Sequence, residues 1–262
     1  MTALRFRTAG SRVDLFCEDA ALAELVRRVG APMLAPEHDS PADVVLEAAD
    51  VPIPAGATVE QRAARVLSAV DRAALAASSA LPIHAAAVAG PRGCVVLPGE
   101  SGRGKTTLAA AAMQLHLVLL SDEAACLTEP VGTVLPHPRP LGLSLHSRNL
   151  LGITEPGEPA DELACAPDLF GASASTDDRS TCVSIVLPCR SPGAEPALEE
   201  IGRSNALAAL LASRLDGSHG AEPWSDKRAW RYLTELVDSV PVARLRYDRP
   251  QDGAQVLASL VV

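Results

Sequence analysis

One stretch, residues 94–107, constrains the fold of this chain more than any other. It contains Gly99-x-x-x-x-Gly104-Lys105-Thr106, the spacing of loops whose backbone N–H groups surround phosphate oxygens. An apolar run precedes this pattern and an alanine-rich segment follows it, which predicts a strand before the loop and a helix after it. A phosphate at the start of this helix would meet unpaired N–H donors and the positive end of the helix dipole.

The loop residues have specific expected roles. Lys105 is expected to reach the β- and γ-phosphates of a nucleotide, and the Thr106 hydroxyl is expected to bind Mg²⁺. The only other lysine is Lys227, so a compact ammonium group kept in this loop fits a contact with phosphate. The alternative is a glycine-rich turn with an exposed lysine. The predicted nucleotide-binding residues are Gly99, Glu100, Ser101, Gly102, Arg103, Gly104, Lys105, Thr106 and Thr107.

Composition and charge exclude several classes of protein. The 262 residues suffice for one large globular domain, or for one domain and a smaller one. The formal net charge of −9 argues against nucleic acid or an anionic membrane as a partner. The N-terminus lacks the apolar core of a signal peptide, and no segment can span a bilayer. We therefore expect a cytoplasmic protein with reduced thiols, in which Cys94 and Cys182 lie in the core.

The order of elements predicts an α/β fold with a small α+β region over residues 1–78 and a second domain over 79–262. In the first part, Asp19 is expected to cap a helix, and Thr58 with Gln61 forms a capping box before another. In the second, a strand over residues 81–89 is expected to pair antiparallel with the strand before the loop. Further strands are expected around Pro136 to Pro140, and Trp230 is expected to face inward from a C-terminal helix.

Two acidic residues and one histidine are expected near the loop. Asp122 and Glu123 follow an apolar strand predicted over residues 117–120, and one helix and one strand separate them from Lys105. Carboxylates there can hold Mg²⁺ or accept a proton from an attacking hydroxyl, unless they are simply acids at a strand end. His84 lies on the strand expected to pair with the one before the loop. It is either a hydrogen-bonded core residue or a group that orients an acid or the phosphoryl group.

The motifs Ile83-His84, Gly99 to Thr106 and Asp122-Glu123 together resemble the C-terminal domain of HPr kinase/phosphorylase. They resemble more closely the shorter HPr-kinase-related proteins of bacterial gene clusters for peptide modification, including those that make lasso peptides. The resemblance covers about residues 76–145. It implies a phosphate-binding loop among mixed β-sheets, as in phosphoenolpyruvate carboxykinase, and it implies ATP, Mg²⁺ and transfer to a serine hydroxyl. By position it makes Asp122 the candidate general base, Glu123 an acid that binds the metal or its water shell, and His84 the neighbour of Glu123.

The sequence departs from the family pattern in two places. Glu123 stands where the family usually has aspartate, and Arg148 to Ile153 only faintly matches the glycine-rich signature that carries an arginine. Arg139, flanked by prolines, is our first candidate for an arginine that stabilises the transition state, and Arg148 is the second. Each of them, taken singly, is more typical of a surface arginine.

We therefore expect an ATP- and Mg²⁺-dependent kinase that phosphorylates a serine of a peptide or small protein. A non-catalytic nucleotide-binding module and a small-molecule kinase stay open as alternatives, and so does a homo-oligomer. The N-terminal region and an acidic loop over residues 155–162 are expected to set the choice of acceptor.

Overall fold

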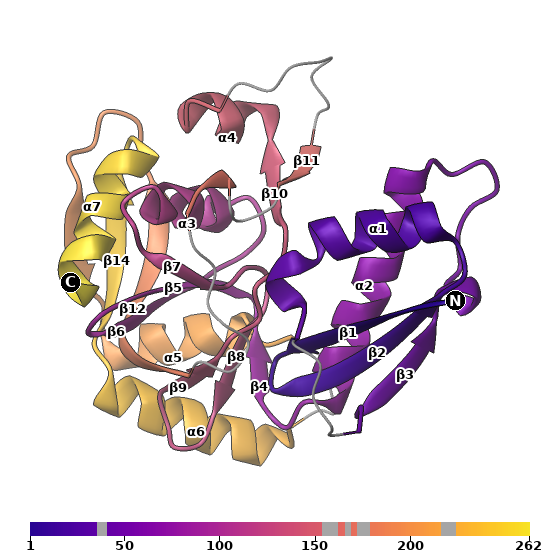
Figure 1. Ribbon diagram of the computed structural model, residues 1–262. Coiled ribbons are helices and arrows are strands. Elements are labelled where there is room, and N and C mark those ends of the chain that lie inside the picture. Colours follow the sequence, from indigo (N-terminus) through magenta and orange to yellow (C-terminus); the bar gives the residue numbers. More distant parts are fainter. Residues whose placement is uncertain (36–40, 154–161, 166–168, 172–178, 216–223) are drawn as a thin grey trace.

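The computed structural model describes residues 1–35, 41–153, 162–165, 169–171, 179–215 and 224–262. Within these ranges the fold is α/β with mixed sheets, as the sequence predicted, and a small three-stranded sheet lies beside a large one (Figure 1). None of the helices in these ranges has the length and apolar character needed to cross a membrane. Of the expected acidic loop, residues 155–161 lie outside the described part of the chain.

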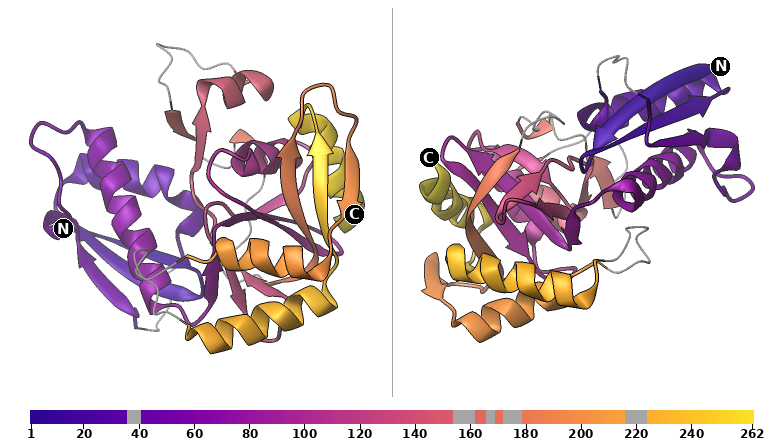
Figure 2. Two further views of the ribbon diagram at one scale, coloured as in Figure 1. Left: turned by 180° about the vertical axis from the view of Figure 1, so that it is seen from behind. Right: turned by 90° about the horizontal axis from the view of Figure 1, so that it is seen from below.

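The described residues of the range 1–77 include a three-stranded sheet and two α-helices that cover it, which Figure 2 shows to one side of the large sheet. The sheet order is β1-β2-β3, with β1 and β2 antiparallel and β2 and β3 parallel. Asp19 and the Thr58–Gln61 capping box cap the two α-helices as predicted. The elements are β1 (Thr2–Thr8), β2 (Ser11–Cys17), α1 (Ala20–Val29), η1 (Ala31–Met33), β3 (Val44–Glu47), η2 (Ala48–Asp50) and α2 (Val59–Ala77).

The large sheet has the order β4-β8-β9-β12-β6-β5-β7, and β14 pairs with β12 and with β13. Strand β6 is parallel to β12 and antiparallel to β5, so the sheet is mixed. Its strands are β4 (Leu81–Ile83), β5 (Ala85–Gly90), β6 (Gly93–Pro98), β7 (Val118–Ser121), β8 (Ala125–Thr128), β9 (Thr133–Leu135), β12 (Ser180–Arg190), β13 (Ala197–Glu200) and β14 (Val242–Tyr247). A separate pair consists of β10 (Leu141–Ser144) and β11 (Glu162–Cys165).

Helices cover both faces of the large sheet, because its central strands are apolar on both faces. Cys94 and Val96 of β6 pack toward α5 and α6, whereas Val95 and Leu97 pack toward α3 and α7. Cys94 and Cys182 are buried, as predicted. The helices are α3 (Lys105–Met113), α4 (Leu145–Leu150), α5 (Arg203–Ala212), α6 (Asp226–Ser239) and α7 (Pro250–Val261).

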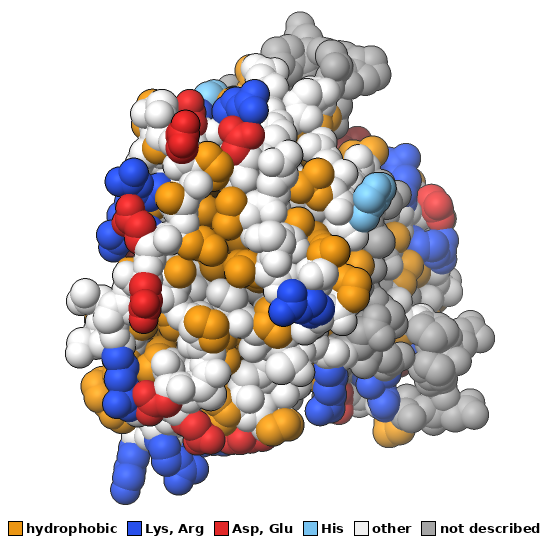
Figure 3. Space-filling model, turned by 90° about the vertical axis from the view of Figure 1, so that its left-hand side faces the viewer, with side chains coloured by type: hydrophobic (Ala, Val, Ile, Leu, Met, Phe, Trp, Pro, Cys, Tyr) orange, Lys and Arg blue, Asp and Glu red, His pale blue; other side chains and the backbone are white. Residues whose placement is uncertain are grey.

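The side of the molecule that carries α7 and β14 has a mixed surface (Figure 3). Apolar side chains lie among uncharged groups in the middle of this face, and charged side chains of both signs lie toward its edges. Because positive and negative side chains are mixed on this face, it has no large positive field of the kind that attracts a polyanion such as nucleic acid.

Two expectations about local structure, on residues 81–89 and on Trp230, were wrong. The strand expected over residues 81–89 is broken at His84, whose N–H donates to the carbonyl of Ser213, so that β4 pairs with β8 and β5 with β6. The strands expected around Pro136 to Pro140 are present as β9 and β10 on either side of this segment, which itself forms only a single bridge at His137 because its prolines donate no ladder hydrogen bond. Trp230 is 54% exposed, because the buried stripe of α6 runs through Ala229, Tyr232, Leu233 and Leu236.

Candidate active site

The loop of residues 99–104 joins the end of β6 to the start of α3, as the sequence predicted. Gly104 is the N-cap residue of α3 and has φ +82°, a conformation that favours glycine. A Cβ atom at this position would lie 3.0 Å from the hydroxyl oxygen of Tyr247, so a side chain would also be crowded there. The first N–H groups of α3 have no partner within the helix, which leaves them available to a ligand.

The topology of the sheet brings the acidic pair to this loop. Strand β7 is antiparallel to β5, which is antiparallel to β6, so β7 runs in the same direction as β6. Asp122 and Glu123 follow the end of β7 and therefore lie at the same edge of the sheet as the loop after β6. His84 reaches this edge because Ala85 pairs with Pro98, and the N–H of Gly99 donates to the His84 carbonyl at 3.3 Å.

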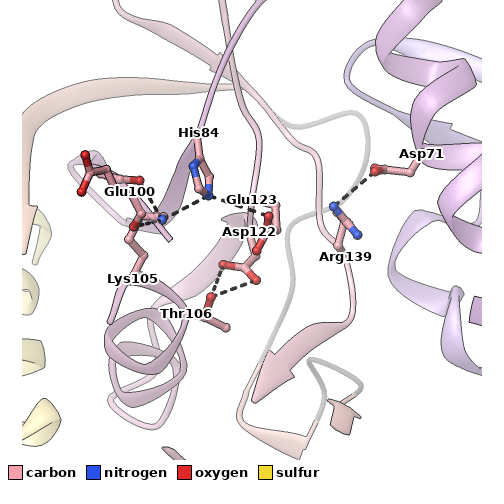
Figure 4. A network of polar contacts seen from close by, with 9 residues as sticks. Asp71, His84, Glu100, Lys105, Thr106, Asp122, Glu123 and Arg139 are labelled. Carbon is pink, nitrogen blue, oxygen red and sulfur yellow. Dashed lines mark hydrogen bonds and ion pairs between the residues drawn. The ribbon is translucent and has the colours of Figure 1, made fainter. Parts of the chain in front are cut away.

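Lys105 is turned into the loop rather than into solvent (Figure 4). Its Nζ donates to the carbonyl oxygens of Gly99 at 2.8 Å and of Glu100 at 2.9 Å, and it lies 3.2 Å from Nε2 of His84. The residue is only 5% exposed. Burial lowers the pKa of the ammonium group, and the negative charges of Glu123 and Asp122 oppose that shift. The expected alternative of an exposed lysine on a glycine-rich turn is therefore wrong.

Thr106 and Asp122 contact each other directly beneath the start of α3. The Thr106 hydroxyl donates to Oδ1 of Asp122 at 3.0 Å and lies 3.3 Å from Oδ2. Asp122 is buried, and this burial, followed by the charge of Glu123, raises its pKa to about 6. The Thr106 hydrogen bond and the positive charges of Arg139 and Lys105 limit the rise. Asp122 is thus a carboxyl group with a pKa close enough to neutral pH for it to gain and lose a proton there.

Glu123 differs from its neighbour in both conformation and exposure. Its φ of +72° is in the left-handed region, which a glutamate seldom occupies. Its side chain is 56% exposed, and Oε2 lies 3.8 Å from Nε2 of His84. The backbone turn at Glu123 therefore points two successive carboxylates to different places, one beneath the loop and one into the open space beside it.

A cavity of about 350 Å³ lies over the loop, within the size range of about 300–1,000 Å³ that is usual for small-molecule sites. Several residues of its wall were not predicted from the sequence, because they come from separate elements and carry no motif. The Thr107 hydroxyl donates to the Ser147 Oγ at 2.8 Å, and Nη1 of Arg190 lies 3.0 Å from Nε2 of His146. The wall consists of residues 101–107 together with Glu123, Gly142, Ser144, His146, Ser147, Leu150, Arg190, Tyr247 and Pro250.

The two candidate arginines lie away from this cavity. Arg139 forms an ion pair with Asp71 of α2, with Nη1 of the arginine 3.2 Å from Oδ2 of the aspartate. Arg148 is a buried residue of α4 and is only 4% exposed, so it is not the surface arginine that its sequence context suggested. Neither arginine lines this cavity, whereas Arg103 and Arg190 do.

The donor set beneath the loop suits Mg²⁺ only together with a bound phosphate. Thr106, Asp122 and Glu123 offer hydroxyl and carboxylate oxygens, which Mg²⁺ prefers. Among the residues that the structure describes, no group of three or more His, Cys, Asp or Glu side chains could hold a metal ion on its own. Because Mg²⁺ is commonly held by one or two carboxylates and the phosphates of a substrate, the residues fit a nucleotide-bound ion.

Comparison with known proteins adds little to this geometry. No protein-family model matches the chain, and no curated protein sequence matches it. Among solved structures it is similar to the Hpr(Ser) kinase/phosphatase from Coxiella burnetii, with 12% sequence identity over 68% of this chain and 91% of that chain. The TM-score is 0.29. At that value the likeness carries no weight of its own, so the chemistry of the site rests on its contacts.

Proposed function

We propose that this protein is an ATP- and Mg²⁺-dependent phosphotransferase that transfers the γ-phosphoryl group to a hydroxyl, as in a serine of a peptide or small protein. One observation carries this proposal: the hydroxyl of Thr106 donates to the buried carboxylate of Asp122 directly beneath a glycine-rich loop and its buried lysine. A loop that only turns the chain needs neither a buried lysine nor a carboxylate, because each costs free energy to desolvate.

Nucleotide binding follows from the donors at the start of α3. The N–H groups of the loop and of the first helical turn surround the phosphates, and Lys105 exchanges its two carbonyl partners for phosphate oxygens. A lysine charge about 4 Å from a phosphate charge is worth about 4 kcal/mol at an effective dielectric constant of about 20. Most of that contribution is lost when the ammonium group is removed.

Thr106 and Glu123 would hold the Mg²⁺ ion together with the phosphates, and Asp122 would orient the Thr106 hydroxyl. When bound, the ion neutralises the charge of the β- and γ-phosphates. His84 lies beside both Lys105 and Glu123 and holds these two groups apart. Its ring therefore keeps the ammonium group and the carboxylate from forming a direct ion pair that would fill the phosphate site.

The transfer step uses one of the two carboxylates as a base. The acceptor oxygen forms a bond to the γ-phosphorus, the bond to the β–γ bridging oxygen breaks, and its electron pair leaves on ADP. The hydroxyl proton passes to Asp122, which at a pKa of about 6 is about nine-tenths ionised at neutral pH. Glu123 is the second candidate for this proton, because it lines the cavity and Asp122 does not.

The test compares the two lysines of the chain. Lys105→Ala is expected to lower ATP affinity and γ-phosphoryl transfer by at least about 100-fold, since each 1.4 kcal/mol is about tenfold. Lys227→Ala is the matched control, because Lys227 is exposed on α6, and it is expected to change neither quantity. ATP binding is measured by calorimetry, and transfer is measured by mass spectrometry of peptides encoded beside the gene. Equal activity of the two variants would end the proposal.

A nucleotide-binding accessory module is the rival function, and Asp122→Asn separates the two. A phosphotransferase loses transfer while it keeps ATP affinity within about threefold, because the amide retains an acceptor for Thr106. A module that only binds nucleotide has no transfer to lose, and its variant keeps full partner function. A small-molecule kinase shares the chemistry and differs in acceptor, which the same mass spectrometry identifies when small hydroxyl compounds replace the peptides.

A further inference from the structure

A second, smaller cavity of about 140 Å³ lies on the other side of Glu123. Glu123 is the residue that lines both cavities, so its carboxylate stands between them. His84, between β4 and β5, and Arg139, between β9 and β10, line one side of the smaller cavity. Asp71 and Leu75 line it from α2 of the N-terminal unit. The smaller cavity is thus built from both parts of the chain, and it opens beside the groups expected to hold the γ-phosphate.

A buried network fixes the Arg139 side of this cavity. Asp71 is 7% exposed, and its two carboxylate oxygens lie 2.6 Å from Nε2 of His137 and 3.2 Å from Nη1 of Arg139. Nδ1 of His137 lies 2.7 Å from the hydroxyl of Thr8, which is fully buried. Figure 4 shows Arg139 between Asp71 and the carboxylates of the site. The N-terminal unit therefore positions a guanidinium group at the edge of the site.

We propose that this second cavity is the acceptor pocket, and that it takes a short aliphatic hydroxyl group of the size of a serine side chain. The inference rests on the proposed phosphotransfer. Cavities that enclose whole small molecules begin at about 300 Å³. The volume of the second cavity is less than half of that value, so only the hydroxyl-bearing group of the acceptor enters it. The rest of the acceptor stays outside, against the N-terminal unit.

The position of the pocket suits an in-line displacement. The acceptor oxygen approaches the γ-phosphorus from the side of Glu123 that faces Arg139, and ADP leaves on the side of the loop. In this arrangement the carboxylate of Glu123 lies beside the acceptor hydroxyl and can receive its proton. The guanidinium group of Arg139 faces the oxygens of the transferred phosphoryl group. Asp71 acts in this scheme as a positioning residue, because it touches Arg139 and not the reacting atoms.

The experiment uses three compounds on the full chain: ATP, and the γ-phosphate esters of ATP with N-acetylserine amide and with N-acetyltyrosine amide. Calorimetry is expected to show that the wild type binds the serine ester at least as tightly as ATP. It is expected to bind the tyrosine ester at least about tenfold more weakly, because the phenol ring exceeds the pocket. A wild type that binds ATP but does not discriminate between the esters overturns the pocket. A wild type that does not bind ATP overturns the proposed function itself.

Filling the pocket tests its location. Leu215 is a partly buried residue of the pocket wall, and Leu215→Trp is expected to weaken the serine ester by at least about tenfold while ATP affinity changes by less than about threefold. Leu198→Trp is the matched control, because Leu198 is 40% exposed on β13 and lines neither cavity. An equal loss for ATP and the ester, or no loss in a folded variant, overturns the proposal.

A variant that enlarges the pocket instead of filling it provides a second test if Leu215→Trp does not fold. Leu215→Ala widens the pocket, so the tyrosine ester is expected to gain at least about fivefold in affinity while ATP does not. A folded Leu215→Ala protein without that gain overturns the pocket equally well.

Discussion

The ammonium group of Lys105 lies 3.2 Å from Nε2 of His84, and the same nitrogen lies 3.8 Å from a carboxylate oxygen of Glu123. The ring can accept a hydrogen bond from Lys105 only while Nε2 carries no proton. In that state it helps to hold the lysine in the loop and leaves the carboxylate free. His84 is therefore expected to influence the charged groups Lys105 and Glu123 rather than to shape the nucleotide-binding site.

His84→Asn is expected to lower transfer about tenfold, while ATP affinity changes by less than about threefold, since the loop amides still bind phosphate. The matched control is His116→Asn, because His116 is exposed, lies outside both cavities and has a φ of +67° that asparagine tolerates. Single-turnover kinetics and calorimetry measure the two quantities. A loss of ATP affinity as large as the loss of rate would show that His84 shapes the nucleotide site instead.

Transfer is expected to depend on pH through Asp122. The base must be ionised, so with a pKa of about 6 the rate rises about tenfold per pH unit below that value and levels off above it. Initial rates between about pH 4.5 and 8 measure this profile. Asp122→Asn should remove the rise together with most of the rate. A rise that persists in this variant and disappears in Glu123→Gln would assign the proton to Glu123.

The same residue is expected to lower the stability of the protein as pH rises from about 4 to about 6. The folded-state pKa of about 6 exceeds the unfolded value of about 3.8, so the folded protein holds the proton more tightly and loses stability as pH rises between these values. The loss corresponds to about 3 kcal/mol. Urea unfolding should therefore find Asp122→Asn more stable than the wild type at about pH 7.5 and equal to it near pH 4. A variant that is less stable at both values would refute this expectation.

Gly104→Ala is expected to abolish nucleotide binding and to destabilise the fold. The residue has φ +82°, and the added Cβ would lie 3.0 Å from the Tyr247 hydroxyl oxygen. Gly56→Ala carries a similar strain at φ +79° with no atom within 4 Å, so it isolates the conformational cost of about 1–2 kcal/mol. Thermal unfolding and ATP titration of both variants measure these effects. ATP affinity that falls equally in both would exclude a local effect on the loop.

Asp71→Asn is expected to destabilise the protein by about 3–5 kcal/mol, because it removes the buried carboxylate that pairs with Arg139 and lies 2.6 Å from Nε2 of His137. Burial by itself would raise the Asp71 pKa, but His137 and Arg139 hold it below the ordinary value. This contribution is present above about pH 4 and is lost as pH falls through the lowered pKa. Asp238→Asn, which breaks an exposed pair with Arg203, should cost about 0–1 kcal/mol in the same urea titration. Similar losses in the two variants would argue against a buried network.

Features with a local cause were predictable from the sequence. The Asp19 cap, the capping box at Thr58 and the turn from strand to helix at Gly104 each depend on residues a few positions apart. The position of Asp122 beside the loop was also predictable, because one helix and one strand return the chain to the same edge of the sheet. Such inferences need only periodicity, capping and connection length.

Features that depend on distant segments were not predictable. The pairing of Asp71 with Arg139 joins two parts of the chain, and nothing near either residue indicates the other. The same holds for Arg190 and Tyr247 in the wall of the larger cavity. The break at His84 depends on a carbonyl of Ser213, which outweighs the continuous apolar pattern of residues 81–89. Tertiary contacts decided these outcomes, not local propensity.

The left-handed backbone at Glu123 has a consequence for how this protein could change over time. Glycine would relax that conformation and would remove the carboxylate in the same step. Selection for stability alone would therefore favour the replacement of Glu123 by glycine. A measurement of stability would not reveal that the carboxylate had been lost. A glutamate at such a position is therefore what we expect if its carboxylate serves the proposed reaction.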